Sequence, residues 1–193
     1  MKNTVTPFKL KSLKILLLLA FTVFFSISAV YAQRDPIDIN IIIDGSESLI
    51  NVKEEVRIWL SGRLDQILAQ GDRVTVWSAA SSARIIYSGR MDSSAETEAV
   101  KKSIADISPS GINADLSGAL RQAAGQQSAE QGFSYTLLIS ASPAALSSTL
   151  SGPQANLLRH SRVEEFPAWR AFVIGLNLDS RVKRAAASFI NAQ

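Results

Sequence analysis

The sequence predicts an α/β domain whose doubly wound, mostly parallel sheet has about five strands flanked by helices. Apolar runs of strand length alternate with segments in which apolar residues recur every three or four positions. The first run, 38–44 (DINIIID), is β-branched and continuous, as in a strand buried on both faces. The runs at 73–80 and 83–87 are too close for a parallel crossover, so the third strand must be antiparallel to the second.

Residues 1–32 have the composition of a signal peptide, which leaves 33–193 as a single domain. Four lysines lead into an apolar stretch at 15–25, and residues 30–32 (VYA) offer a cleavage site of modest side chains. The apolar stretch is shorter than the about 20 residues that span a bilayer. We therefore expect cleavage after Ala32, a periplasmic or secreted protein, and no integral membrane span after cleavage.

The charge of the chain changes once this leader is set aside. It holds four of the 20 Lys and Arg residues and none of the 17 acidic ones, so the remainder carries 16 basic and 17 acidic residues. That balance gives no electrostatic case for binding nucleic acid or an anionic membrane. The chain also lacks cysteine, so neither disulfides nor an acylated cysteine can hold it, and stability must come from burial.

Two helices are expected in the first half of the domain. The first follows the 38–44 strand and ends near Gly71, with apolar residues at helical spacing: Val52, Val56, Trp59, Leu60, Leu64, Ile67 and Leu68. We expect Trp59 in the core, as well as Trp77 and Trp169. The second begins with a capping box, Ser93 and Glu96, and ends before Pro109.

The second half continues the alternation. Five small or apolar residues predict a short helix: Leu116, Ala119, Leu120, Ala123 and Ala124. Runs at 135–139 and 171–176 predict the fourth and fifth strands, and the pattern at 182–190 predicts a closing helix. We expect the Ser-, Ala- and Pro-rich segment 140–153 to form a loop and 154–162 a short helix.

The most informative motif follows the first strand. In open α/β sheets ligands bind beyond the carboxyl ends of the strands, and Asp44-Gly45-Ser46-Glu47-Ser48 lies there. One carboxylate and two hydroxyls on a tight turn are hard oxygen ligands of the kind that Mg²⁺ and Mn²⁺ prefer. This D-x-S-x-S pattern resembles the opening of the metal-ion-dependent adhesion site in the von Willebrand factor A-type family.

The resemblance extends over 36–192. It includes the short hairpin, the stretch 111–120 (GINADLSGAL) and the strand 172–175 (FVIG). It implies the sheet order 3-2-1-4-5, with the antiparallel third strand at one edge. It also implies that a bound Mg²⁺ or Mn²⁺ would contact Ser46 and Ser48 directly and Asp44 mostly through water.

The sequence departs from the family at the two positions that complete the metal site. Ala114 stands where the family has Thr, and Ala141 where it has Asp, and a methyl group cannot bind a cation. If the loops are shifted by one residue, neighbouring side chains would supply the missing oxygen ligands. These neighbours are Asn113, Asp115, Ser140 and Ser142. Two interpretations stay open, a weakened cation site and a metal-free site, and the departures favour the second. In a purely structural interpretation, Asp44 and Ser48 cap the following helix.

A further departure is at the end of the sheet. The family continues with a sixth strand and a last helix, whereas this sequence ends after the helix that follows the fifth strand. We therefore expect the strand at 171–176 to lie at the sheet edge, where another chain could add to it.

The resemblance implies an exported binding or scaffold module rather than an enzyme. Its partner would be another exported or envelope protein, contacted through Glu47, Asn113 and Ser142 on the loops at the carboxyl edge of the sheet. Two alternatives stay open, a phosphate-ester hydrolase with Asp44 as nucleophile and a structural subunit that assembles through its sheet edge. A serine hydrolase is disfavoured because Asp44 and Ser48 stand two residues before and after Ser46, where a nucleophile elbow has glycine. We expect His160 at the surface.

Overall fold

The computed structural model describes residues 35–126, 132–159 and 168–191, and the chain divides into two units, 1–35 and 36–193. The predicted signal peptide and His160 lie outside the described residues. Within the described part of the chain, no helix is long and apolar enough to cross a membrane.

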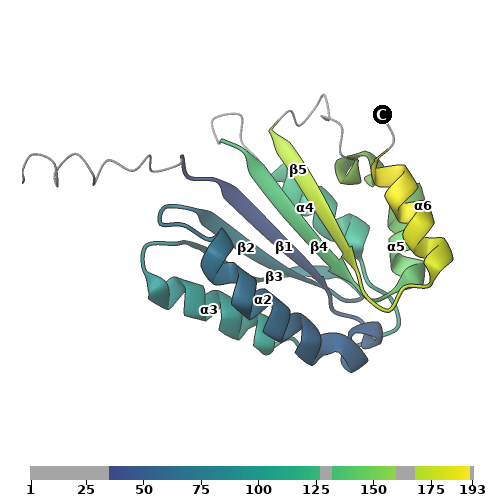
Figure 1. Cartoon of the computed structure of the whole chain (residues 1–193), viewed down its shortest axis with the longest axis horizontal. Helices are drawn as coiled ribbons and strands as arrows, with labels where there is room; N and C mark the ends of the chain where they lie inside the picture. The colour runs from purple at the N-terminus through teal and green to yellow at the C-terminus, as the bar shows by residue number, and fades with distance from the viewer. Residues whose placement is uncertain (1–34, 127–131, 160–167, 192–193) are drawn as a thin grey trace, which may run out of the picture. The chain divides into compact units, whose positions relative to one another are not determined.

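In the described part of the chain, five strands form one mixed sheet in the order β3-β2-β1-β4-β5 (Figure 1). Their bounds are β1 Asp38–Asp44, β2 Arg73–Ala79, β3 Ala83–Arg90, β4 Ser134–Ser140 and β5 Trp169–Gly175. β1 pairs in parallel with both β2 and β4, β4 pairs in parallel with β5, and β3 is antiparallel to β2. The strand order and the antiparallel third strand are therefore as predicted.

Helices cover both faces of this sheet. The α-helices are α2 Lys53–Ile67, α3 Ser94–Ala105, α4 Leu116–Gly125, α5 Pro143–Ser151 and α6 Ser180–Ile190, with 3-10 turns η1 Glu47–Val52 and η2 Ala155–Leu158. η1, α2 and α3 pack on one face of the sheet, and α4, α5, η2 and α6 contribute to the core on the other (Figure 1).

The alternation of side chains along β1 builds both cores at once. Ile39, Ile41 and Ile43 point to the α2 and α3 side, and Ile42 points to the α4 side. All four are at most 5% exposed. This central strand is therefore buried on both faces, as its unbroken apolar sequence predicts, and its end is held at a fixed place.

Two local predictions are wrong. The segment 140–153 contains helix α5, because Ser142 accepts a hydrogen bond from the Ala145 amide as an N-cap, Pro143 occupies the first turn, and Leu146 is buried. Trp59 is 41% exposed, because Val56 and Leu60, one turn apart, already fill the inward face of α2 beside it.

Other local predictions are confirmed. The capping box at Ser93 and Glu96 is present, and Trp77 and Trp169 are buried. Of the predicted helix at 154–162, the described residues form only the short turn η2.

Candidate functional site

The carboxylate of Asp44 lies at the carboxyl edge of the sheet and is fully buried. Its Oδ1 accepts hydrogen bonds from the Ser46 amide at 2.9 Å and the Ser46 hydroxyl at 2.6 Å. The Ser48 hydroxyl donates to Oδ2 at 3.3 Å and lies 2.5 Å from the Ser46 hydroxyl oxygen. The D-x-S-x-S turn therefore wraps around its own aspartate.

The same carboxylate also holds the loop that follows β4. Asp44 Oδ2 accepts hydrogen bonds from the Ser140 hydroxyl at 2.8 Å and from the Ala141 and Ser142 amides at 3.3 and 3.2 Å. Because β1 and β4 are parallel neighbours, their carboxyl ends meet at one edge, which brings residues almost a hundred positions apart together. Asp44 thus accepts six hydrogen bonds from two loops.

A third loop joins through its backbone. The Ser110 amide donates to the Gly45 carbonyl and the Glu47 amide donates to the Gly111 carbonyl, both at 2.8 Å. The Asp115 amide donates to the carbonyl of Ala80, the residue after β2, also at 2.8 Å. The rim, as we name the loops 45–48, 108–115 and 140–142, is therefore tied together by hydrogen bonds within the described residues.

Gly45 is required by this close approach of the loops. A Cβ atom at that position would lie 2.5 Å from the Ser78 hydroxyl oxygen and 3.3 Å from the Ala80 amide nitrogen. Both distances are shorter than a normal contact, so a side chain would force the turn away from β2. The glycine in the motif serves the packing of the turn against the neighbouring strand.

The structure separates the predicted helper residues into two groups. Ser140 and Ser142 contact Asp44, but the Ser142 hydroxyl caps α5 and the residue is only 7% exposed. Asp115 caps α4 by accepting a hydrogen bond from the Gly118 amide at 2.9 Å. Asn113 is exposed and, within the described residues, makes no side-chain hydrogen bond to Asp44. Glu47 is also exposed, so Glu47 and Asn113 are available for contact with a partner.

The arrangement matches a divalent cation poorly. Among the described residues, Asp44 is the one carboxylate that bonds to the Ser46 and Ser48 hydroxyls, both of its oxygens accept hydrogen bonds, and the Ser46 hydroxyl is buried beneath the turn. Among the described residues there is no group of three or more His, Cys, Asp or Glu side chains that could hold a metal ion. A cation reaching Ser46 would have to open the turn, so this geometry favours the metal-free interpretation.

The interpretation of Asp44 and Ser48 as helix caps is wrong. Neither η1 nor α2 begins with a side-chain cap, and the Ser48 hydroxyl donates to Asp44 instead of accepting from the helix. The aspartate organises the rim rather than the start of the helix.

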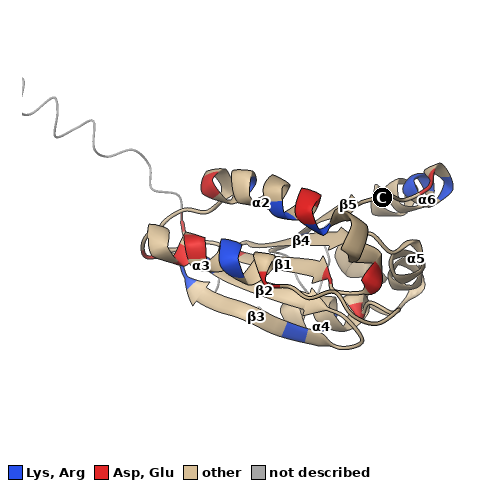
Figure 2. Cartoon of the chain, turned by 90° about the horizontal axis from the view of Figure 1, so that it is seen from below, with Lys and Arg blue, Asp and Glu red and all other residues tan. Residues whose placement is uncertain are grey.

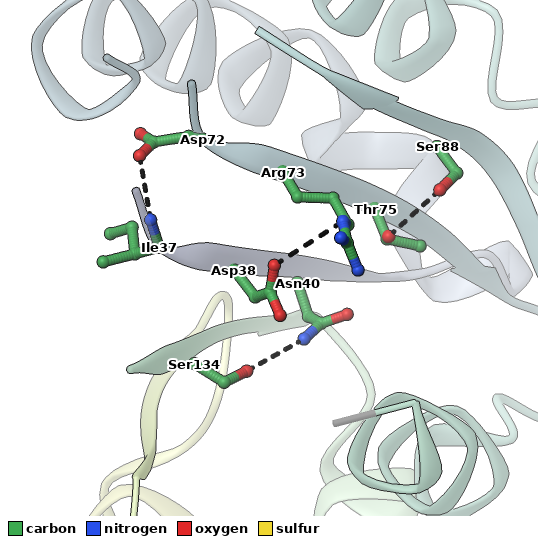
Figure 3. Close-up of polar contacts among 8 residues, drawn as sticks. All are labelled: Ile37, Asp38, Asn40, Asp72, Arg73, Thr75, Ser88 and Ser134. Carbon is green, nitrogen blue, oxygen red and sulfur yellow. Dashed lines mark hydrogen bonds and ion pairs between the residues drawn. The ribbon is translucent and has the colours of Figure 1, made fainter. Parts of the chain in front are cut away.

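A second polar cluster, which the sequence did not indicate, lies toward the amino ends of the parallel strands β1, β2 and β4 (Figure 3). The Asn40 amide donates to the Ser134 hydroxyl at 3.4 Å, and Arg73 lies 3.8 Å from Asp38. Burial raises the pKa of Asp38, and the nearby Arg73 opposes that rise. The cavity here is about 30 Å³, room for about one water molecule, so the cluster serves the structure rather than binding a larger ligand.

Comparison with solved structures places the fold among known ones. A von Willebrand factor type A protein from Catenulispora acidiphila has a TM-score of 0.50 and 17% identity, over 80% of this chain and 43% of that one. Proximal thread matrix protein 1 from the mussel byssus has a TM-score of 0.50 and 16% identity, over 81% and 39%. The pilus adhesin SpaC from Lactobacillus rhamnosus GG has a TM-score of 0.47 and 16% identity, over 56% and 16%.

The chain thus spans less than half the length of each of these three proteins. No family profile and no curated protein matches the sequence. The sheet order, the antiparallel third strand, the helices on both faces and the similarity to the Catenulispora acidiphila structure agree. The chain therefore has the von Willebrand factor A-type fold.

Proposed function

We propose that this chain is an exported module that binds another protein through its rim. The observation that carries the proposal is the buried Asp44 carboxylate, which holds two loops by side-chain hydrogen bonds while a third is joined through its backbone. Loops ordered before binding lose less conformational freedom when a partner docks. Export is inferred from the leader-like composition of residues 1–32.

Exposed side chains on and beside these loops supply the means of recognition. Ile112 on the 108–115 loop is 84% exposed, and Ile50 on η1 is 57% exposed. Glu47 and Asn113 on the same loops are also exposed and add polar groups to this surface. An apolar centre with a polar surround is the usual composition of a protein interface.

Recovery of the partner from envelope extracts tests the proposal. We expect the full chain to capture a partner, Ile112→Lys to lose it, and Ile58→Lys to keep it, because Ile58 is 60% exposed on α2 and outside the rim. Equal capture by all three proteins would show that the rim is not the binding surface.

We further propose that this binding needs no divalent cation. Calorimetry with Mg²⁺ and Mn²⁺ should give the same heats for the wild-type chain, Asp44→Ala and Ser48→Ala. Ser48→Ala is included because Ser48 is only half-buried and its loss perturbs the fold less. A saturable heat that only the wild-type chain gives would contradict metal-free binding.

The hydrolase alternative finds little support in this geometry. A nucleophilic carboxylate must reach a phosphorus atom, and Asp44 is fully buried with both oxygens accepting hydrogen bonds. We expect a panel of chromogenic phosphate esters to show no turnover that depends on Asp44.

Assembly through the sheet edge is a second candidate function, because an aromatic strip lies beside β5. Phe172 on this edge strand is 50% exposed, and its ring stacks on Tyr135 with centroids 6.4 Å apart. Exposed edge strands are sites where other chains add. Light scattering during size-exclusion chromatography should then find an oligomer that Phe172→Glu dissociates, whereas a monomeric wild-type chain would exclude this candidate.

A further inference from the structure

We propose that the groove between β3 and α3 binds an extended segment of the partner in which an apolar side chain stands next to a carboxylate. The inference rests on the proposed protein-binding function and names the chemistry of the segment that is bound. It depends on the shape of the groove, the unpaired edge of β3 and the charge at one end.

A β-bulge creates the groove. Val76 pairs with Tyr87 and Trp77 pairs with Ile85, so Ile86 has no opposite residue on β2. A bulge of this kind re-aims a side chain, and here Ile86 packs with Tyr87 against the core under α2 and α3, while Ile85 is on the strand's other face. One inserted residue therefore turns two neighbouring side chains toward α3.

The groove is large enough for a side chain with its flanking backbone. Its volume is about 330 Å³, which lies within the range of about 300–1,000 Å³ for ligand sites. Ile86, Ala99 and Ile107 supply apolar surface. Ala99 is exposed on α3, so the small residue leaves the space above the strand open.

The edge of β3 can guide an extended chain along the groove. β3 is at one end of the strand order, and among the described residues no strand pairs with its outer side. A groove between an edge strand and a helix is the geometry in which PDZ and PTB domains bind peptides by strand addition. An edge strand, β3, and a helix beside it, α3, are likewise present here, and the regular pairing of β3 is interrupted at the bulge.

The charge at one end selects the neighbour of the apolar side chain. The charged residues of β3 are Arg84 and Arg90. Figure 2 shows the blue of basic residues on this strand. Arg90 is 3.6 Å from Asp92 and Lys102 is paired with Asp106, whereas Arg84 is exposed without a carboxylate partner among the described residues. A carboxylate of the bound segment would complete the ion pair with Arg84.

The other end of the groove disfavours a carboxylate. Burial, and to a lesser extent Glu96, raises the pKa of Tyr87, so its hydroxyl is neutral and can donate a hydrogen bond. The negative charge of Glu96 itself repels an anion there. The direction of the bound segment is therefore set by charge, with its acidic residue at Arg84.

The Arg84 end of the groove, where the acidic residue of the bound segment would lie, is next to the rim. Ala79 of β2 is opposite both Asp44 of β1 and Ala83, the first residue of β3. Arg84 follows directly, and the Asp115 amide bonds to the Ala80 carbonyl. A partner docked on the rim could therefore place one extended segment in the groove.

Selection from a random heptapeptide phage library against the full chain tests this inference. We expect the enriched peptides to place an aliphatic or aromatic residue beside Asp or Glu. Binding of these peptides should weaken by at least about tenfold in Arg84→Glu, where attraction becomes repulsion, and in Ala99→Trp, which fills the groove. Matched controls are Arg90→Glu on the same strand and Ala95→Trp on an exposed position of the same helix, and both should bind as the wild-type chain does.

Failure of the groove and failure of the rim can be told apart. No enriched peptides, or peptides that bind Ala99→Trp as well as the wild-type chain, would overturn the inference. Partner capture that needs Ile112 but neither Arg84 nor an open groove would also overturn it and leave the rim function standing. Groove-dependent peptides without any capture that depends on Ile112 would support the groove and contradict the rim.

Discussion

Replacing Asp44 by Ala should reveal how much the rim depends on one carboxylate. The change removes the acceptor of six hydrogen bonds. The three hydroxyl donors can rotate to other acceptors, and the Ser142 amide keeps the Ser140 hydroxyl oxygen at 3.1 Å. The amides of Ser46 and Ala141 stay in place and lose their acceptor. A buried unsatisfied donor costs about 1–3 kcal/mol, so we expect a loss of about 3–5 kcal/mol from the free energy of unfolding.

Urea denaturation followed by circular dichroism measures this loss. The midpoint should fall at an unchanged slope, since the surface exposed on unfolding stays the same. Ser93→Ala is the comparison, because it removes one exposed helix cap and should cost only about 1 kcal/mol. A loss below about 1 kcal/mol for Asp44→Ala would refute the reasoning, because it would mean that water or loop movement satisfies the freed amides.

Three smaller predictions use glycine and the capping box. Gly45→Ala should lower the urea midpoint, because its Cβ would lie 2.5 Å from the Ser78 hydroxyl oxygen; an unchanged midpoint would contradict the close approach. Gly62→Ala should raise the midpoint, by about 0.5–1 kcal/mol in unfolding free energy, because nothing lies near the new methyl group within α2. The Ser93 hydroxyl and backbone hydrogen bonds lower the pKa of Glu96, so an NMR titration should find its midpoint below the ordinary 4.5. A group with a lowered pKa stabilises the fold above its unfolded pKa and loses that contribution as pH falls through its folded pKa. Glu96→Gln should therefore flatten the dependence of the unfolding free energy on pH in this acidic range.

The strands could be predicted because burial leaves a direct trace in the sequence. β1 is continuous and β-branched, and its bounds agree with the prediction residue for residue. The antiparallel β3 followed from a connection that no helix could fit. The failures arose where the apolar signal is weak or ambiguous. Helix α5 depends on the Ser142 cap and on Pro143 rather than on an apolar pattern. Trp59 is at helical spacing, but spacing alone could not show that it lies at the border of the apolar face of α2.

The candidate site was predicted in part for the same reason. Asp44, Ser46 and Ser48 are local in sequence, so a strand end and a short turn bring them together. That Ser140 donates to Asp44 while Asn113 does not depends on which loop lies over the carboxylate, and sequence spacing carries no such information. The groove was missed because a bulge depends on the register between two strands. Arg84, the one charged residue in the predicted strand 83–87, was its one available signal.

By itself, the amino-acid sequence determined the alternation of strands and helices, the central position of 38–44 and the placing of the D-x-S-x-S turn at its end. These are consequences of hydrophobic periodicity and chain connectivity, which act over a few residues at a time. Only the tertiary structure decided that Asp44 is buried under six donors, that Ile112 is exposed, and that β3 and α3 enclose a groove. Those features depend on the packing of segments far apart in the chain, where backbone register and the space between elements choose among side chains that look equivalent in sequence.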